Sequence, residues 1–178
     1  GLVTYIRTDS VRVSSQAVAA ASSYISEKYG AEYVGNNVFS NKNKAMQDAH
    51  EAIRPSDVTL EPSMIKDSLT QDQYKLYDLI WERFVASRMA AAEFDTVQVL
   101  INNGRYEFRA NGARMTFDGW KKVYKTGAAE GEVNIPKLSE GQVLDLKKLI
   151  KEQKFTQPPA RYTEASLVRK LEELGIGR

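Results

Sequence analysis

The stretch TQDQYKLYDLIWERFVASRMAA at residues 70–91 decides the fold of the first half of the chain. Thr70 and Gln73 have the spacing of a capping box, in which two side chains satisfy free N–H groups at a helix start. Behind this box, large apolar side chains recur at helical spacing and line one face, namely Tyr74, Tyr77, Trp81, Phe84, Val85 and Met89. The pattern predicts a long helix that ends near Ala91 and contributes its aromatic face to a core.

Toward the N-terminus, a second helix is predicted from about Ser14 to Tyr29. Its apolar residues Val18, Ala21, Ile25 and Tyr29 share one stripe, Ser14 or Ser15 can cap its start, and Gly30 can end it. Before it, the β-branched and aromatic run GLVTYI at residues 1–6 favours a short strand. Between the two helices, residues 31–49 are polar and rich in turn formers, so a loop is expected there.

Toward the C-terminus, the apolar period changes from helical to alternating at Phe94. The alternation is interrupted by Asn102-Asn103-Gly104 and again by Asn111-Gly112, and both are turn sequences. Residues 94–125 are therefore predicted to form a meander of short strands.

The last part of the chain is less regular. Residues 143–155 fit a helix or a strand by periodicity, so both assignments stay open on the residues alone. Pro158-Pro159 breaks any regular element, and the run from Thr163 then predicts a capped helix that ends at Leu174-Gly175.

Composition excludes several classes of site. The 178 residues include no cysteine and one histidine, which excludes disulfides, thiolate nucleophiles, zinc fingers and two-histidine metal centres. The net charge is only +2, so a site for a polyanion has to come from local clustering of cations. No apolar run approaches the roughly 20 residues that cross a bilayer, so no membrane partner is expected. The chain starts at Gly1 without an initiator Met and reads as an excised piece.

The heptad TYIRTDS at residues 4–10 carries groups suited to phosphoryl chemistry. If this segment is extended, Tyr5 and Arg7 point to the same face, so that a phenol nucleophile and a two-pronged cation address one site. The alternative is that Tyr5 is an edge-strand aromatic residue and Arg7 a solvated partner of Asp9.

A second motif, HEAIR at residues 50–54, begins like a zinc-protease helix. Arg54 stands where the second histidine is needed, so a metalloprotease is excluded. His50 is then either a hydrogen-bonded structural residue or part of another kind of site.

Three motifs in order resemble bacterial type IA DNA topoisomerases: GLVTYIRTDS at 1–10, HEAIRP at 50–55 and PPARYTEASLV at 158–168. The resemblance covers nearly the whole chain. It implies an α+β fold made of a mainly helical strand-gate domain with a short β segment at the tyrosine (1–92), a β-rich antiparallel arch segment (93–156) and the first helix of a single-strand-binding domain (157–178). It also favours a strand for residues 143–155.

By this resemblance, Tyr5 is the nucleophile that cleaves single-stranded DNA and holds its 5′ phosphate. Arg7 stabilises the scissile phosphate, and His50 serves in hydrogen bonding or proton management, with Asp9 as a local partner. The remaining expected DNA contacts are Thr4, Asp9, Arg54, Arg161 and Thr163, of which Thr163 has an equal alternative as a simple helix cap.

The resemblance also implies what lies elsewhere. The family's metal-binding toprim domain has no counterpart here, since the sequence has no Asp-x-Asp. Mg²⁺ is therefore expected in the parent enzyme with ligands outside this chain, and no cofactor in the chain itself. DNA and the remaining parent domains are the expected partners, and the bacterial cytoplasm, at the nucleoid, is the expected location. The isolated piece is expected to be inactive, and the alternative is a non-catalytic single-stranded-DNA-binding or structural module.

Overall fold

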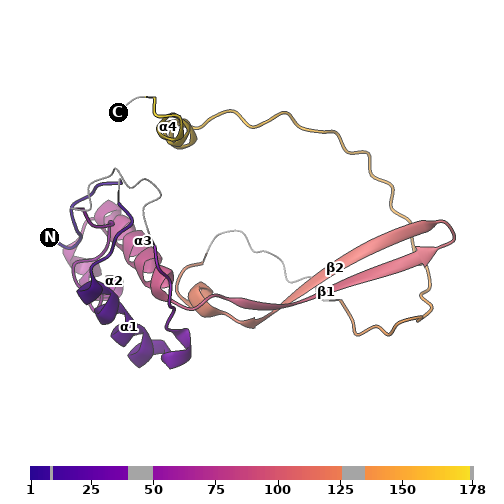
Figure 1. The fold of residues 1–178 in the computed structure, drawn as a ribbon, viewed down its shortest axis with the longest axis horizontal. Helices are drawn as coiled ribbons and strands as arrows, with labels where there is room; N and C mark the ends of the chain where they lie inside the picture. The colour runs from indigo at the N-terminus through magenta and orange to yellow at the C-terminus, as the bar shows by residue number, and fades with distance from the viewer. Residues whose placement is uncertain (9, 40–49, 126–134, 177–178) are drawn as a thin grey trace. The chain divides into compact units, whose positions relative to one another are not determined.

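The computed structural model describes residues 1–8, 10–39, 50–125 and 135–176. In chain order its elements are α1 (Ser15–Tyr29), η1 (Ala31–Tyr33), α2 (Pro62–Ile65), η2 (Lys66–Ser68), α3 (Gln71–Arg88), β1 (Glu93–Asn103), β2 (Tyr106–Phe117), η3 (Gly119–Lys122) and α4 (Glu164–Glu173) (Figure 1). The chain divides into two compact units, Gly1–Lys137 and Leu138–Arg178, and each is described by itself. The mixture of helices with an antiparallel sheet confirms the predicted α+β class, while the division into three domains stays a prediction.

Both long helices begin where their caps predict. The Ser14 side chain accepts a hydrogen bond from the Ala17 amide at the start of α1, and Gly30 ends this helix. At the start of α3 the predicted capping box is present, with Thr70 and Gln73 each accepting a hydrogen bond from the other's amide. Helix α3 ends at Arg88, three residues before the predicted end, because Met89 turns to extended backbone.

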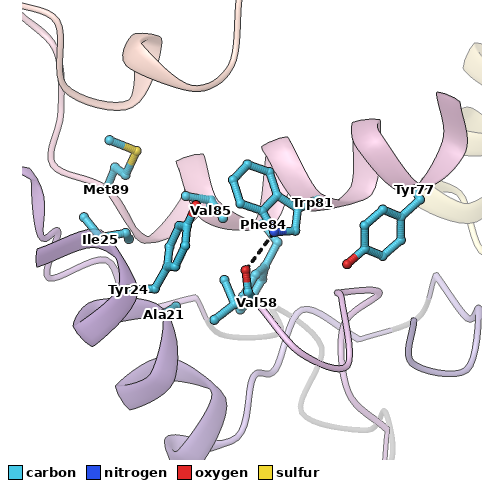
Figure 2. Close-up of a cluster of buried hydrophobic side chains, with 9 residues drawn as sticks. All are labelled: Ala21, Tyr24, Ile25, Val58, Tyr77, Trp81, Phe84, Val85 and Met89. Atoms are coloured by element: carbon cyan, nitrogen blue, oxygen red, sulfur yellow. Dashed lines mark hydrogen bonds between the residues drawn. The ribbon is translucent and has the colours of Figure 1, made fainter. Parts of the chain in front are cut away.

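The core lies between α1 and α3, with Val58 from the segment between them (Figure 2). The Trp81 indole N–H donates to the Val58 carbonyl at 2.9 Å, and its ring meets Tyr24 edge-on with centroids 5.7 Å apart. The predicted aromatic face of α3 is therefore the inner face, and burial of such rings is the main stabilisation of a small helical unit. The buried apolar cluster comprises Ala21, Tyr24, Ile25, Val58, Tyr77, Trp81, Phe84, Val85 and Met89.

Strands β1 and β2 form one antiparallel hairpin rather than the predicted meander (Figure 1). The two-residue loop contains Gly104, whose φ of +60° suits a residue without a Cβ. The second predicted turn is wrong, because Asn111 and Gly112 lie inside β2 opposite Gln98 and Val97. The Gln98 side-chain amide donates to the Asn111 side-chain oxygen at 3.1 Å, so the pairing across the strands satisfies this asparagine without a turn.

The N-terminal run does not form the predicted strand. It makes a single antiparallel bridge between Val3 and Pro55, flanked by hydrogen bonds from the Thr4 amide to the Arg54 carbonyl and from the Ser56 amide to the Leu2 carbonyl. Next to this bridge, the Thr4 hydroxyl forms hydrogen bonds with the Ala52 carbonyl and the Arg54 amide. In the predicted loop at 31–49, residues 31–33 form η1, and residues 40–49 lie outside the described residues.

In the second unit, residues 143–155 form neither the predicted strand nor a helix. A strand needs a neighbour for its backbone hydrogen bonds, and none of the described residues pairs with this segment. Helix α4 has its predicted cap, since the Thr163 hydroxyl accepts from the Ser166 amide at 3.2 Å.

No helix within the described ranges combines the length and apolar character required to cross a membrane.

Candidate active site

The Thr4 side chain joins the two motifs that the sequence singled out. Its Oγ1 donates to the Ala52 carbonyl at 2.9 Å and accepts from the Arg54 amide at 3.0 Å. With the Thr4 amide donating to the Arg54 carbonyl at 2.9 Å, these contacts hold the residue before Tyr5 against the HEAIR segment. The backbone that carries Tyr5 is thus positioned by side-chain as well as main-chain hydrogen bonds.

Arg7 and His50, 43 residues apart in the sequence, meet in the same region. Arg7 Nη1 lies 3.4 Å from His50 Nε2, at the long end of hydrogen-bond distances. Because a guanidinium has only donors, Nε2 is the acceptor in this contact. The imidazole of His50 and the guanidinium of Arg7 are therefore within hydrogen-bonding distance of each other.

The backbone of His50 is fixed from the other side by Ser10. The buried Ser10 hydroxyl donates to the His50 carbonyl at 2.7 Å and accepts from the Arg12 amide at 3.2 Å. The Ala52 amide in turn donates to the Arg12 carbonyl at 2.7 Å. The segment after Tyr5 and the segment after His50 therefore run side by side as one hydrogen-bonded pair.

Glu51 is the ionic centre of this arrangement. Its carboxylate accepts from Arg54 Nη2 at 2.6 Å and Nε at 3.2 Å, and from the Ser14 amide at the start of α1 at 2.9 Å. Burial of the Glu51 carboxyl acts to raise its pKa, but the hydrogen bonds from Arg54 and Ser14 outweigh burial and hold the pKa below its ordinary value. The HEAIR segment is thereby tied to the first helix.

The predicted site residues divide into two groups. Tyr5, which is 82% exposed, lies with Thr4, Arg7, His50 and Arg54 in the first unit. Arg54 is engaged by Glu51 and by the Pro55 carbonyl at 3.0 Å. Arg161 and Thr163 are exposed residues of the second unit, and Asp9 lies outside the described residues.

Comparison with known proteins agrees with this arrangement of motifs. A family model described as DNA topoisomerase matches residues 1–178. The chain belongs to the DNA topoisomerase family. It is also similar to the structure of full-length topoisomerase I from Thermotoga maritima, with a TM-score of 0.75 and 38% identity over 99% of this chain and 28% of that chain. The resemblance to bacterial topoisomerases drawn from the three motifs is confirmed.

This topoisomerase family member does not provide a ligand set for Mg²⁺ in its described part. Within residues 1–8, 10–39, 50–125 and 135–176, no three His, Asp or Glu side chains gather into a group that could hold a metal ion. Glu51 is occupied by Arg54 and Ser14.

Ser10 and Glu51 stand within the motifs of this topoisomerase chain, but the sequence predicted no role for either residue. Ser10 bonds to His50, 40 residues away, and Glu51 bonds to Ser14, 37 residues away, and no spacing rule connects positions so far apart. The second partner of Glu51, Arg54, is three residues away. Arg88 was also missed, although its signal was available: a charged residue seven positions after Trp81, on the buried stripe of α3.

Proposed function

We propose that this chain carries the cleaving tyrosine of a longer type IA DNA topoisomerase that relaxes negatively supercoiled DNA by transient cleavage of one strand. The observation that carries the proposal is that Arg7, two residues after the exposed Tyr5, contacts His50. Membership of the family supports the same conclusion. The chain spans 28% of the similar Thermotoga maritima chain, so the activity belongs to the enzyme as a whole.

In the cleavage step, Tyr5 Oη attacks the phosphorus of a phosphodiester in single-stranded DNA. A bond forms between Oη and phosphorus, and the bond from phosphorus to the 3′ oxygen breaks. The phenol gives up its proton and the departing 3′ oxygen takes up a proton, so a 5′-phosphotyrosine and a free 3′ hydroxyl result. The exposure of Tyr5 leaves its hydroxyl open to a DNA strand and to the water that exchanges these protons.

Arg7 stabilises the negative charge that collects on the non-bridging oxygens during this transfer. Its planar donors match two oxygens of one phosphate. His50 acts on Arg7 through the Nε2 contact, which restricts the guanidinium to one region beside the Tyr5 segment. A group fixed before the reaction costs less reorganisation in the transition state than a freely moving one.

Thr4 and Arg54 chiefly fix the position of the backbone next to Tyr5. Thr4 holds the backbone before the nucleophile, and the side chain of Arg54 is committed to Glu51 and Pro55. Arg161, Thr163 at the start of α4, and Asp9 are the further proposed DNA contacts. An exposed helix start with a hydroxyl and free N–H groups is suited to a phosphate.

Within the complete enzyme, we propose that Mg²⁺ is held by acidic residues of another domain. The other partners are single-stranded DNA and the remaining domains of the parent, and the place of action is the bacterial nucleoid. These assignments rest on family membership. They predict that the chain alone binds DNA weakly and does not cleave it.

The decisive experiment is capture of the covalent intermediate. The full-length enzyme is incubated with a single-stranded oligonucleotide labelled 3′ of the cleavage site, quenched in detergent, digested with a protease and analysed by mass spectrometry. We expect the label on a peptide that contains Tyr5. A label on another tyrosine would overturn the assignment, and absence of any adduct would favour the alternative, a non-catalytic single-stranded-DNA-binding or structural module.

A further inference from the structure

Arg88 is a buried cation without an anionic partner in the described part of the chain. Its side chain is only 6% exposed, and its Nε has no hydrogen-bond partner. The guanidinium donates from Nη1 to the Asn37 carbonyl at 3.1 Å and lies over the face of the Phe39 ring, 4.9 Å from its centroid. Arginine keeps its charge at every physiological pH, so this position holds a full positive charge away from water.

The surroundings of Arg88 compensate this charge only in part. As the last residue of α3, Arg88 benefits from the partial negative charge of the helix C-terminus. The Asn37 carbonyl and the face of the Phe39 ring supply dipoles, whereas a buried guanidinium is stabilised most by a group with formal negative charge. Burial lowers the pKa of Arg88, in agreement with incomplete compensation.

Arg88 also lines a hollow of about 390 Å³ on the first unit. Most of the wall is apolar and includes Val11, Ile53 and Phe84, while the polar lining groups are Arg83, Ser87 and Arg88. Among the residues that the structure describes, no aspartate or glutamate lines the hollow. A volume of this size, with apolar walls and a few polar groups, is typical of a site for a small ligand.

Helix α3 supplies about half of the wall, and part of the rest comes from the two segments that carry the proposed catalytic residues. Val11 follows Arg7 by four residues, and Ile53 lies between His50 and Arg54. The hollow therefore lies between α3 and the two joined segments of the proposed cleavage site, and α3 provides its cations, Arg83 and Arg88. Phe39 covers the Arg88 guanidinium and is itself exposed, so rotation of this ring gives an anion access to it.

We propose that the hollow binds one nucleotide of single-stranded DNA, with its phosphate on Arg88 and Arg83 and its base against the apolar wall. The proposal rests on the proposed function in one respect, the choice of a DNA nucleotide as the source of the phosphate. The anion itself follows from the charge of the hollow. The site provides a second point of attachment for the strand that is cleaved at Tyr5.

The location of binding is tested by NMR on the 178-residue chain, with the arginine Nε–H signals assigned. Thymidine 5′-monophosphate, inorganic phosphate and thymidine are titrated in separate experiments. We expect the Arg88 Nε–H signal to shift with both phosphates and to saturate at a lower concentration of the nucleotide. An Arg88 signal that neither phosphate moves overturns the site, and equal affinity for nucleotide and inorganic phosphate overturns the role of the apolar wall.

The contribution to DNA binding is tested by fluorescence anisotropy with a labelled oligothymidylate. Loss of a charge-assisted contact predicts that Arg88→Gln weakens binding by about tenfold or more. Arg83→Gln, at an exposed position, should weaken binding severalfold with the fold intact, which keeps the test valid if Arg88→Gln unfolds. Arg105→Gln, in the hairpin loop, is the matched control and should change affinity less than twofold. Unchanged affinity in Arg83→Gln together with a folded, unchanged Arg88→Gln contradicts the proposal.

This test is separable from the test of cleavage. Tyr5→Phe removes the proposed nucleophile and leaves the hollow intact, so the Arg88 shift should persist in this variant. If the covalent adduct is lost and the Arg88 signal still shifts, the result bears on the role of Tyr5 and leaves the nucleotide site supported. If the wild-type enzyme forms the adduct and the Arg88 signal does not shift, only the nucleotide site is overturned.

Discussion

The Thr4 hydroxyl and the Arg54 amide are hydrogen-bonded at 3.0 Å across 50 residues of sequence. The same hydroxyl donates to the Ala52 carbonyl at 2.9 Å, so one small side chain serves two backbone groups of the HEAIR segment. Thr4 immediately precedes the proposed nucleophile. The position of Tyr5 relative to His50 therefore depends on a contact that only the folded chain brings about.

Removal of this hydroxyl should slow cleavage. Thr4→Val keeps the shape and leaves the Ala52 and Arg54 groups without their partner, at a cost of about 1–3 kcal/mol for the part-buried groups. We expect the single-turnover cleavage rate of the full-length enzyme to fall by an order of magnitude or more, because the Tyr5 backbone loses its tether. Thr4→Ser, which retains the hydroxyl, should restore most of the rate. Equal rates for the valine and serine variants would show that the tether has no role.

Tyr5→Phe should abolish the covalent adduct while the fold persists. The substitution deletes the attacking oxygen and keeps the ring, and the side chain is exposed, so stability should change by less than about 0.5 kcal/mol. The measurement is adduct formation in denaturing gels, with circular dichroism as the control for folding. An adduct in this variant would refute the assignment of the nucleophile.

Arg7→Lys should cleave much more slowly than the wild type. Lysine preserves the charge but lacks the planar pair of donors, and it cannot make the same contact with His50 while holding a phosphate at two points. We expect a loss of roughly one to two orders of magnitude in single-turnover rate, with a smaller effect on DNA affinity. His50→Gln, which removes the imidazole partner of Arg7, should reduce the rate in the same direction. If Arg7→Lys cleaves as fast as the wild type, Arg7 is only a surface cation.

Glu51→Gln should remove a pH-dependent part of the stability. The pKa of Glu51 is lower in the folded chain than its ordinary value near 4.5, so the ionised carboxylate stabilises the fold above that value, and this stabilisation is lost as the pH falls through the folded-state pKa. At pH 7 we expect the variant to be about 1–3 kcal/mol less stable, since Arg54 loses an anionic partner. The difference from wild type should shrink steadily below about pH 4.5.

Urea unfolding of the chain, followed by tryptophan fluorescence between pH 3 and 7, measures this difference. Glu107→Gln is a suitable control, because its ion pair with Arg109 is on the exposed hairpin. A Glu51→Gln effect that is independent of pH would indicate that packing, not charge, is responsible.

The 178-residue chain alone should neither cleave nor relax DNA. It contains Tyr5, Arg7 and His50, whereas the Mg²⁺ ligands and the surface that holds the DNA against Tyr5 are proposed to belong to other domains of the parent enzyme. Losing half of a positioned site costs orders of magnitude in rate. The chain is incubated with labelled oligonucleotides and Mg²⁺, with and without the remaining domains of the parent. Efficient adduct formation by the chain alone would show that those domains are not required.

Local signals in the sequence determined the helices. The caps Ser14, Thr70 and Thr163 each bond within three residues of their own position, so their effect is independent of the rest of the fold. The apolar stripe of α3 likewise predicted the buried face, because a helix fixes the relative directions of its side chains. Three ordered motifs were also enough to indicate the topoisomerase family.

The tertiary structure decided what depends on partners distant in sequence. Strand formation at residues 1–6 and 143–155 failed as a prediction because a strand needs a paired neighbour, which propensity does not supply. Asn111-Gly112 has turn chemistry, yet pairing with β1 keeps it in a strand. The contacts of Thr4, Ser10 and Glu51, and the buried charge of Arg88, likewise arise only when segments some 40 to 50 residues apart close on one another. The sequence therefore showed which types of residue form the site. It did not show their geometry, because that geometry depends on contacts between segments far apart in the sequence.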